Sequence, residues 1–226
     1  RRAEGERAVS MSMYVSPEQM MLDRAEFARK GIARGRAVAV LRYADGIVLV
    51  ADNHSTTLNK VAEIYDRIGF AAVGRYNEFE ALRVAGIRHA DLRGYAYDRR
   101  DVTGRSLAGA YSQQLGGTFA SGSEKPFEVE LIVAELGEEP GHDVLYRVGY
   151  DGVISDEKDL AVVGGDAERI GGLLRASFDA TAPLRDAVAA AGAALGSSQL
   201  EVAVLERGTG RRRAFRRLAR EELPRG

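Results

Sequence analysis

The chain of 226 residues and 24.4 kDa is long enough to form one compact domain with a sizeable core. Its 32 basic and 33 acidic residues nearly cancel, so the net charge gives no reason to expect nucleic acid or a membrane surface as a partner. The absence of cysteine excludes disulfides, thiolate metal sites and cysteine nucleophiles, and no apolar run approaches the roughly 20 residues that span a bilayer.

The first predicted element is a helix near the N-terminus. Ser16 is an expected N-cap, and Pro17 suits the first helical position because its missing N–H costs nothing there. Gly31 or Gly35 is expected to end the helix. The residues before it lack the apolar core of a secretory signal, so we expect a cytoplasmic protein.

Two pairs of strands should follow. Residues 35–53 combine apolar and small side chains on both sides of a turn at residues 44–46, which predicts a β-hairpin. Residues 60–65 and 70–73 are apolar and rich in β-formers, which predicts a second pair.

Two helices are predicted next. Asn77, with Glu80 three residues later, is typical of a capped helix start, and apolar residues follow at helical spacing. Thr103 is the expected N-cap of the following helix, after a polar connection.

The second half repeats this order. Strands are predicted first, over residues 127–135, in a hairpin around Asp151 and Gly152, and over residues 160–165. An alanine-rich helix pair follows over residues 166–178 and 183–195, and closing strands are predicted over residues 200–205 and 214–218. Groups of strands separated by helix pairs indicate an α+β fold and not a strict β-α alternation. Two stacked sheets, each covered outside by a helix pair, would bury all the apolar faces. We therefore expect a four-layer αββα sandwich with an additional N-terminal helix.

Long irregular stretches of the chain resemble a known family. The stretches "SPEQMMLDRAEFARKGIARG", "YDRIGFAAVGRYNEFEALRVAGIRHADLRGYAYDRRDVTGR", "EKPFEVELIVAE", "YDGVISDE" and "VVGG" are similar to α-type subunits of the bacterial, and specifically actinobacterial, 20S proteasome. The resemblance runs from about Met13 to about Leu218. It implies a fold of the N-terminal nucleophile hydrolase type and a subunit of a homo-heptameric ring. Four stacked rings of seven, with β-type catalytic subunits inside, would degrade unfolded protein substrates.

The resemblance also indicates where catalysis would occur in β-type relatives. Their threonine nucleophile corresponds to Arg36 here, and the accessory acid and lysine correspond to Asp52 and Lys60. A guanidinium cannot act as a nucleophile, and 35 residues precede Arg36, so no free amine is available there. We therefore expect no catalytic residues. The alternative is an autonomous amidohydrolase of the same fold, which would need a processed N-terminal Thr, Ser or Cys.

In the family, the lysine of this segment lines a pocket between neighbouring subunits and receives the C-terminal carboxylate of an ATPase ring activator. The resemblance therefore implies an activator-docking pocket with Lys60, Pro17 and Gly35. By composition alone, Lys60 would instead be an exposed lysine at a strand entrance, and Pro17 and Gly35 would simply start and stop a helix.

The N-terminal segment resembles the family's gate, whose seven copies obstruct the pore. This interpretation divides the chain into a flexible tail and gate over residues 1–15 and a single domain over residues 16–226, with the gate formed by Ser12, Met13, Tyr14 and Val15. The alternative is an ordinary frayed terminus.

A tyrosine- and arginine-rich connection over residues 93–105 is a candidate assembly interface, because both residue types supply contact area at little entropic cost. The candidates are Arg93, Tyr95, Tyr97, Arg99 and Arg100. The alternative is a local salt-bridge cluster of these arginines with Asp91, Asp98 and Asp101.

The remaining motifs predict no further chemistry. His54, His89 and His142 lack metal-ligand spacing, so we expect no metal site, and the glycine pair at residues 164–165 belongs to no phosphate-binding motif, so we expect no cofactor. The arginine-rich C-terminus would bind nucleic acid only if its charges were free, and we expect a solvated face and no nucleic acid.

Overall fold

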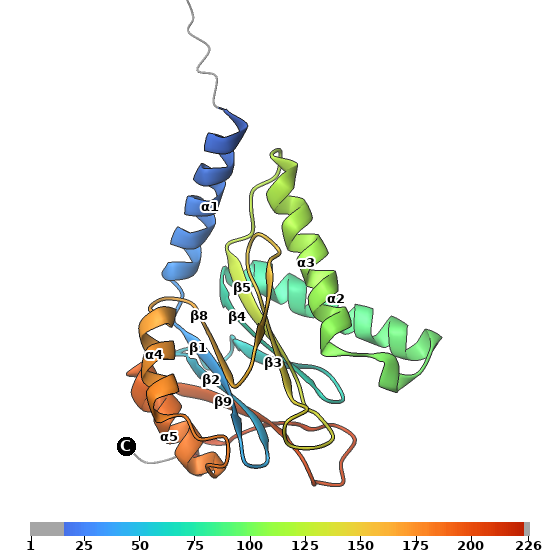
Figure 1. The fold of residues 1–226 in the computed structure, drawn as a ribbon, viewed down its shortest axis with the longest axis vertical. Coiled ribbons are helices and arrows are strands. Elements are labelled where there is room, and N and C mark those ends of the chain that lie inside the picture. The colour runs from blue at the N-terminus through green and yellow to red at the C-terminus, as the bar shows by residue number, and fades with distance from the viewer. Residues whose placement is uncertain (1–15, 224–226) are drawn as a thin grey trace, which may run out of the picture.

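The computed structural model describes residues 16–223, which form two stacked antiparallel sheets with helices on both outer sides (Figure 1). Sheet A has the strand order β10-β9-β2-β1-β8 and sheet B the order β3-β4-β5-β6-β7. The predicted αββα sandwich is confirmed. Its elements are α1 Pro17–Ala33, β1 Val38–Tyr43, β2 Gly46–Asp52, β3 Val61–Tyr65, β4 Ile68–Gly74, α2 Tyr76–Ala96, η1 Arg99–Asp101, α3 Gly104–Ser121, β5 Val129–Glu135, β6 Val144–Val148, β7 Ile154–Glu157, β8 Leu160–Val163, α4 Ala167–Ser177, α5 Leu184–Leu195, β9 Leu200–Glu206, β10 Phe215–Arg217 and η2 Arg220–Glu222.

The strands are apolar on both faces because each sheet is covered on both sides. In β2, Ile47 and Leu49 face sheet B, whereas Val48 and Val50 pack under α4 and α5. The helices α2 and α3 cover sheet B in the same way, around Phe70 and neighbouring apolar residues. This arrangement explains why the strands read as nearly continuous apolar runs and not as strict alternation.

Two predicted helix starts are confirmed and one is wrong. The hydroxyl oxygens of Ser16 and Thr103 accept hydrogen bonds from the third following residue, at 3.1 and 3.2 Å. Asn77, however, lies inside α2, whose N-cap is Arg75 and has no side-chain cap bond. The N–H of Arg75 donates to the Glu128 carbonyl, so a contact with the chain before β5 fixes this helix start.

The glycines expected to end α1 have different roles. Gly31 lies within the helix, and a Cβ there would lie 2.3 Å from a carboxylate oxygen of Glu128, so glycine lets that side chain approach. Gly35 lies beyond the C-cap residue Arg34, and a Cβ there would lie 2.3 Å from Val73 of sheet B.

The helix α1 projects away from the two sheets at the end where β1 begins (Figure 1). The Arg24 guanidinium holds it against α3 by donating to the carbonyls of Phe119 and Thr118, at 3.0 and 2.8 Å. Only Ala28 and Ile32 of the helix are buried. None of the helices within residues 16–223 is long and apolar enough to cross a membrane.

An ion-pair cluster closes the other end of the sandwich. The Asp143 carboxylate, whose side chain is 1% exposed, contacts the guanidinium groups of Arg207 at 2.5 and 3.1 Å and of Arg42 at 3.6 Å. It also accepts from the N–H of Gly137 at 2.9 Å. Because Arg42 lies in β1 and Arg207 directly follows β9 of sheet A, while Asp143 directly precedes β6 of sheet B, the cluster joins the two sheets.

The Tyr111 hydroxyl is buried between α2 and α3 without a hydrogen-bond partner in the described part of the chain, and burial raises the pKa of Tyr111. Tyr111→Phe removes this unpaired group and is expected to raise the free energy of unfolding by about 1 kcal/mol. Urea denaturation checks this, with Tyr95→Phe as an exposed control that should leave the midpoint unchanged. A lower midpoint for Tyr111→Phe would mean that the hydroxyl makes a stabilising hydrogen bond.

Candidate functional site

The start of β1 and the end of β2 bring Arg36 and Asp52 together. The register pairs Val38 with Ala51, so Ala37, directly before β1, lies beside Asp52 at the end of β2, and Arg36 precedes Ala37. The Arg36 guanidinium donates to the Asp52 carboxylate at 3.2 Å. The arginine that the resemblance matches to the nucleophile position is therefore paired with the carboxylate that it matches to the accessory acid.

Lys60 completes this group from the opposite sheet. It lies directly before β3, and its Nζ donates to the carbonyl oxygens of Arg36 at 2.7 Å and of Asp52 at 3.0 Å. Burial lowers the pKa of Lys60 to about 8, although the nearby charges of Asp52 and Glu201 favour the ammonium form. The structure thus places Lys60 in a half-buried polar site, and the interpretation as an exposed lysine is wrong.

Glu201 holds the backbone around Lys60 and was not found by sequence reasoning. Its carboxylate accepts from the N–H groups of Lys60 and Val61, at 2.8 and 3.3 Å, and from the amide of Asn53 at 2.7 Å. The Arg217 guanidinium pairs with it at 2.5 Å. The only signal in the sequence is a glutamate inside the apolar run of β9.

The groups around Asp52 do not form a catalytic triad. The Ser197 hydroxyl donates to Asp52 at 2.8 Å, and the His54 ring nitrogen lies 3.2 Å from the same carboxylate oxygen. A triad needs the imidazole between the hydroxyl and the carboxylate, whereas here the carboxylate lies between the other two. No group of three metal-ligating side chains occurs within residues 16–223.

A cleft next to this group is lined by Gly35, Arg36 and Asp52, and by residues at the start of α4. Lys60 does not line this cleft, but its Nζ donates to the carbonyl of Arg36, the residue after Gly35. Pro17 does not join them, because α1 separates it from Gly35 by 17 helical residues, or about 25 Å. A pocket that contains Lys60, Gly35 and Pro17 can form only if Pro17 comes from another copy of the chain.

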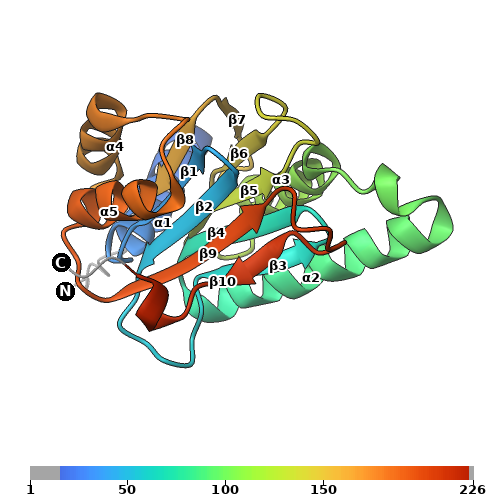
Figure 2. The ribbon, with the colours of Figure 1, turned by 90° about the horizontal axis from the view of Figure 1, so that it is seen from below.

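The tyrosine- and arginine-rich segment begins in the last turn of α2, which extends beyond the sheets (Figure 2), and continues through η1 to the start of α3. Tyr95 and Tyr97 are 93% and 75% exposed. Part of the segment expected as a connection is helical, since α2 continues to Ala96 and is followed by η1.

The alternative of a local salt-bridge cluster in this segment is wrong within the described residues. Arg99 pairs with Asp66 at 2.6 Å, and Arg93 donates to the backbone carbonyl of Asp101 at 2.8 Å. The carboxylate of Asp98 instead caps η1. The predicted gate residues Ser12, Met13, Tyr14 and Val15 lie outside the described part of the chain.

Within the described residues, four of the seven arginines from Arg207 onward are paired with carboxylates, whereas Arg211, Arg212 and Arg220 make no ion pair. Arg207 contacts Asp143, and the guanidinium groups of Arg213, Arg216 and Arg217 contact Glu63, Glu222 and Glu201. The charge of these four arginines is balanced within the protein, which leaves fewer free cations for the nucleic-acid alternative.

The two stacked antiparallel sheets and the outer helix pairs define the N-terminal nucleophile hydrolase class of fold. The sequence pattern of the family described as "Proteasome subunit" matches residues 32–205. The chain belongs to the proteasome subunit family.

Relatives in actinobacteria indicate the type of subunit. The chain is 59% identical over 220 residues to "Proteasome subunit alpha" of Nocardioides sp., which covers 93% of this chain and 86% of the relative. It is 54% identical over 227 residues to the protein of that name from Acidothermus cellulolyticus, an alignment that covers 95% of this chain and 97% of the relative. It is 53% identical over 227 residues to that from Thermobifida fusca, which covers 96% of this chain and 90% of the relative. Its relatives place the chain with the α-type subunits.

Proposed function

We propose that the chain is a non-catalytic subunit of the α ring of a 20S proteasome, which controls the entry of unfolded proteins into a chamber formed by β-type subunits. The observation that carries this proposal is the Arg36–Asp52 ion pair at the position of the nucleophile. Arg36 is preceded by α1 in a continuous chain, so neither a hydroxyl nor a free amine is available there.

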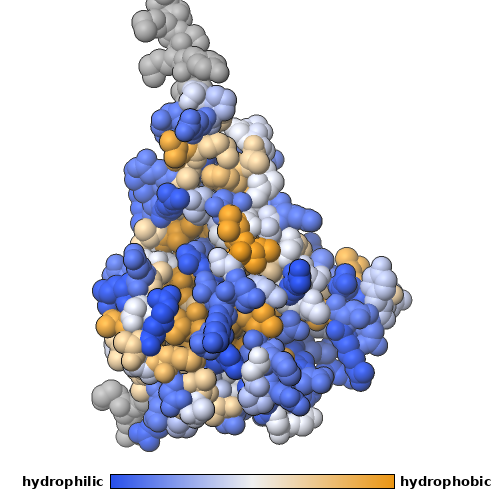
Figure 3. Space-filling model, viewed as in Figure 1, coloured by the Kyte–Doolittle hydropathy of each residue, from blue (hydrophilic) through white to orange (hydrophobic). Residues whose placement is uncertain are grey.

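Exposed apolar surface supports assembly with other subunits. Met20, Leu22 and Phe27 are exposed on α1, and Figure 3 shows hydrophobic side chains along this helix. Tyr95 and Tyr97 are exposed at the tip of α2. Apolar and aromatic side chains that project from a domain are typical of surfaces covered by a partner. We assign α1 and the tip of α2, with Arg93, Arg99 and Arg100, to contacts within the ring or with β-type subunits.

Native mass spectrometry tests the assembly. The chain mixed with its β-type partner is expected to form a particle of four stacked rings of seven subunits. A chain that stays monomeric with and without the β-type subunit would contradict the proposal.

The activator-docking pocket would be shared between neighbouring copies. One copy supplies Gly35 and Lys60, whose Nζ donates to the carbonyl of the residue after Gly35, and the next supplies Pro17, which lies at the far end of α1. The Lys60 ammonium suits the terminal carboxylate of an activator tail, because it acts as a point charge on a flexible stem. Tail binding would shift the equilibrium between the closed and open gate. The free energy of this shift cannot exceed the difference between the free energies with which the tail binds the two states.

Mixed rings test this shared pocket. Rings made only of a Lys60→Ala variant, or only of a Pro17→Glu variant, should not respond to the activator. Rings from a 1:1 mixture of the two variants should respond partly, because about one pocket in four combines an intact Lys60 with an intact Pro17 from its neighbour. If mixed rings do not respond, Lys60 and Pro17 do not meet between neighbouring copies, and the shared pocket is wrong.

Activator docking is expected to weaken as the pH rises from 7 to 9. The pKa of Lys60 is lowered to about 8 by burial, so the ammonium that attracts a carboxylate is lost through this range. The affinity of a labelled activator tail for assembled rings, measured across this range, checks the prediction. An affinity that stays constant up to pH 9 would argue against Lys60 as the docking cation.

The gate is assigned to Ser12, Met13, Tyr14 and Val15 within a tail over residues 1–15, with a single domain over residues 16–226. Deleting residues 1–15 is expected to raise the hydrolysis of small peptides by the assembled particle in the absence of an activator. Activator-stimulated hydrolysis should change little, since the gate is then already displaced. Unchanged unstimulated hydrolysis would mean that this tail does not obstruct the pore.

A further inference from the structure

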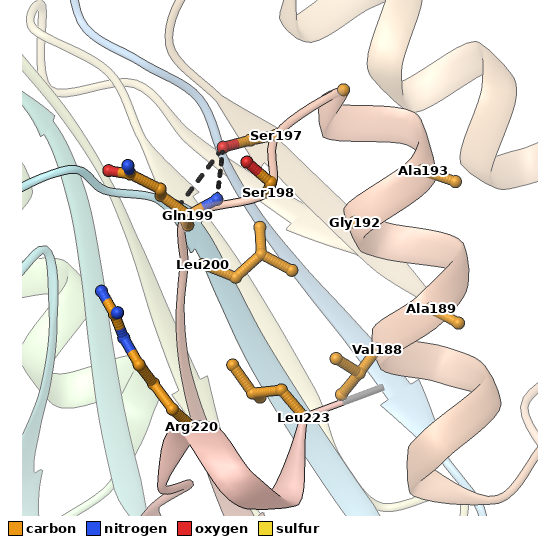
Figure 4. Close-up of a pocket in the computed structure, with 11 residues that line it drawn as sticks. Val188, Ala189, Gly192, Ala193, Ser197, Ser198, Gln199, Leu200, Arg220 and Leu223 are labelled. Atoms are coloured by element: carbon orange, nitrogen blue, oxygen red, sulfur yellow. Dashed lines mark hydrogen bonds between the residues drawn. The ribbon is translucent and has the colours of Figure 1, made fainter. Parts of the chain in front are cut away.

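A hollow of about 680 Å³ opens between α5 and η2 (Figure 4). The side chains of Val188, Leu200 and Leu223 line its interior, and Gly192 keeps the wall formed by α5 low. Val188 and Leu200 belong to the apolar cluster under α5, on the outer face of sheet A. An apolar hollow with an open mouth is a typical place for the side chain of a bound ligand.

The rim of this hollow is polar on one side. Ser198, Gln199 and Arg220 contribute side chains that make no hydrogen bond or ion pair with other residues in the range 16–223. The loop behind them is held in place, because the Ser197 hydroxyl contacts both the N–H and the carbonyl of Gln199, as the dashed lines in Figure 4 show. These contacts fix the backbone of the loop at Gln199, while the side chains of the rim are free to bind a ligand.

The charge of the hollow selects an anionic ligand. Among the described residues that line it, Arg220 is the one charged residue. The turn η2 that carries Arg220 is fixed by Glu222, whose carboxylate accepts from the N–H of Ala219 at 2.8 Å and pairs with Arg216 at 2.6 Å. A guanidinium beside an apolar floor is complementary to a group that joins an apolar side chain to a carboxylate.

This hollow is separate from the group around Lys60. Leu200 pairs with Asp52 in the register of β2 and β9, but its side chain faces α5. Lys60 reaches the strand ends from sheet B, on the other side of sheet A. A ligand in the hollow would therefore not occupy the proposed activator pocket.

We propose that the hollow binds the C-terminal residue of a partner polypeptide. An aliphatic or aromatic side chain lies on the floor formed by Val188, Leu200 and Leu223, and the terminal carboxylate pairs with Arg220. Ser198 and Gln199 bind the peptide backbone amides. These two polar side chains favour a peptide over a fatty acid, whose chain offers them no hydrogen-bond partner.

A fluorescein-labelled peptide, Gly-Ser-Gly-Ala-Leu with a free C-terminus, tests the site by fluorescence anisotropy with the full chain. The same peptide with a C-terminal amide should bind about tenfold more weakly, because the charge-assisted contact with Arg220 is lost. The Arg220→Gln variant should bind the peptide with the free C-terminus about tenfold more weakly than the unchanged protein does. Arg185→Gln, which changes an arginine on α5 outside the hollow, should not.

A second variant tests the apolar floor without disturbing the core. Ala189 is exposed on α5 and lines the hollow, so Ala189→Phe should fill it and abolish binding while the protein stays folded. Lys60→Ala should bind the peptide normally, which separates this site from the activator pocket. Equal binding of the free and amidated peptides, full binding by Ala189→Phe, or displacement of the peptide by laurate at a lower concentration than by unlabelled peptide would overturn the proposal.

Discussion

Replacing Lys60 by alanine is expected to reduce activator-stimulated degradation to the unstimulated rate. The Nζ of Lys60 is held by the carbonyl oxygens of Arg36 and Asp52, two residues that line the cleft together with Gly35. Loss of a charged hydrogen bond to the tail costs about 2 kcal/mol, or roughly thirtyfold in affinity. Degradation of an unfolded protein with and without the activator measures the effect.

Two further variants separate charge from packing at this position. Lys60→Met keeps an unbranched apolar stem of similar length without the ammonium, so it should fail as Lys60→Ala does while rings still assemble. Lys158→Ala, at an exposed lysine in the turn between β7 and β8, should leave the stimulation intact. Normal stimulation of rings with Lys60→Met would remove Lys60 from the docking pocket.

Replacing Asp143 by asparagine is expected to lower the free energy of unfolding by about 3–5 kcal/mol, because it leaves buried arginine charge without its partner. The Asp143 side chain is 1% exposed and those of Arg207 and Arg42 are 13% and 16% exposed, so water compensates little. Arg42 keeps its contact with Asp159 at 3.4 Å, but Arg207 has no second carboxylate among the described ion pairs. A loss of this size lowers the melting temperature by roughly 6–20 °C for a chain of this length.

A surface ion pair provides the control for this experiment. Glu26 and Lys30 pair on α1 with side chains 64% and 67% exposed, so Glu26→Gln should leave the melting temperature unchanged. Equal melting temperatures for Asp143→Asn and Glu26→Gln would show that the ion-pair cluster does not hold the two sheets together.

The sequence predicted the elements whose signals are local. The helix starts at Ser16 and Thr103 depend on a side chain and a backbone group three residues apart, so a short pattern is sufficient. The start of α2 depends instead on a hydrogen bond between Arg75 and Glu128. No pattern near Asn77 carries that information, and the expected cap there was wrong.

The candidate site shows the same limit. Arg36, Asp52 and Lys60 were identified through the resemblance to the family, and the structure brings them together. Glu201 was missed because it reaches Lys60 across 141 residues of sequence, through the pairing of β9 with β2. The separation of Pro17 from Gly35 follows only from the length and position of α1.

The most direct test of the account is the peptidase activity of the purified chain. Without β-type subunits it is expected to hydrolyse no peptide substrate, and intact-mass analysis should find no cleavage that exposes a new N-terminal Thr, Ser or Cys. Hydrolysis of an amide bond by the chain alone, lost when that new N-terminal residue is changed, would contradict the assignment of a non-catalytic gating subunit.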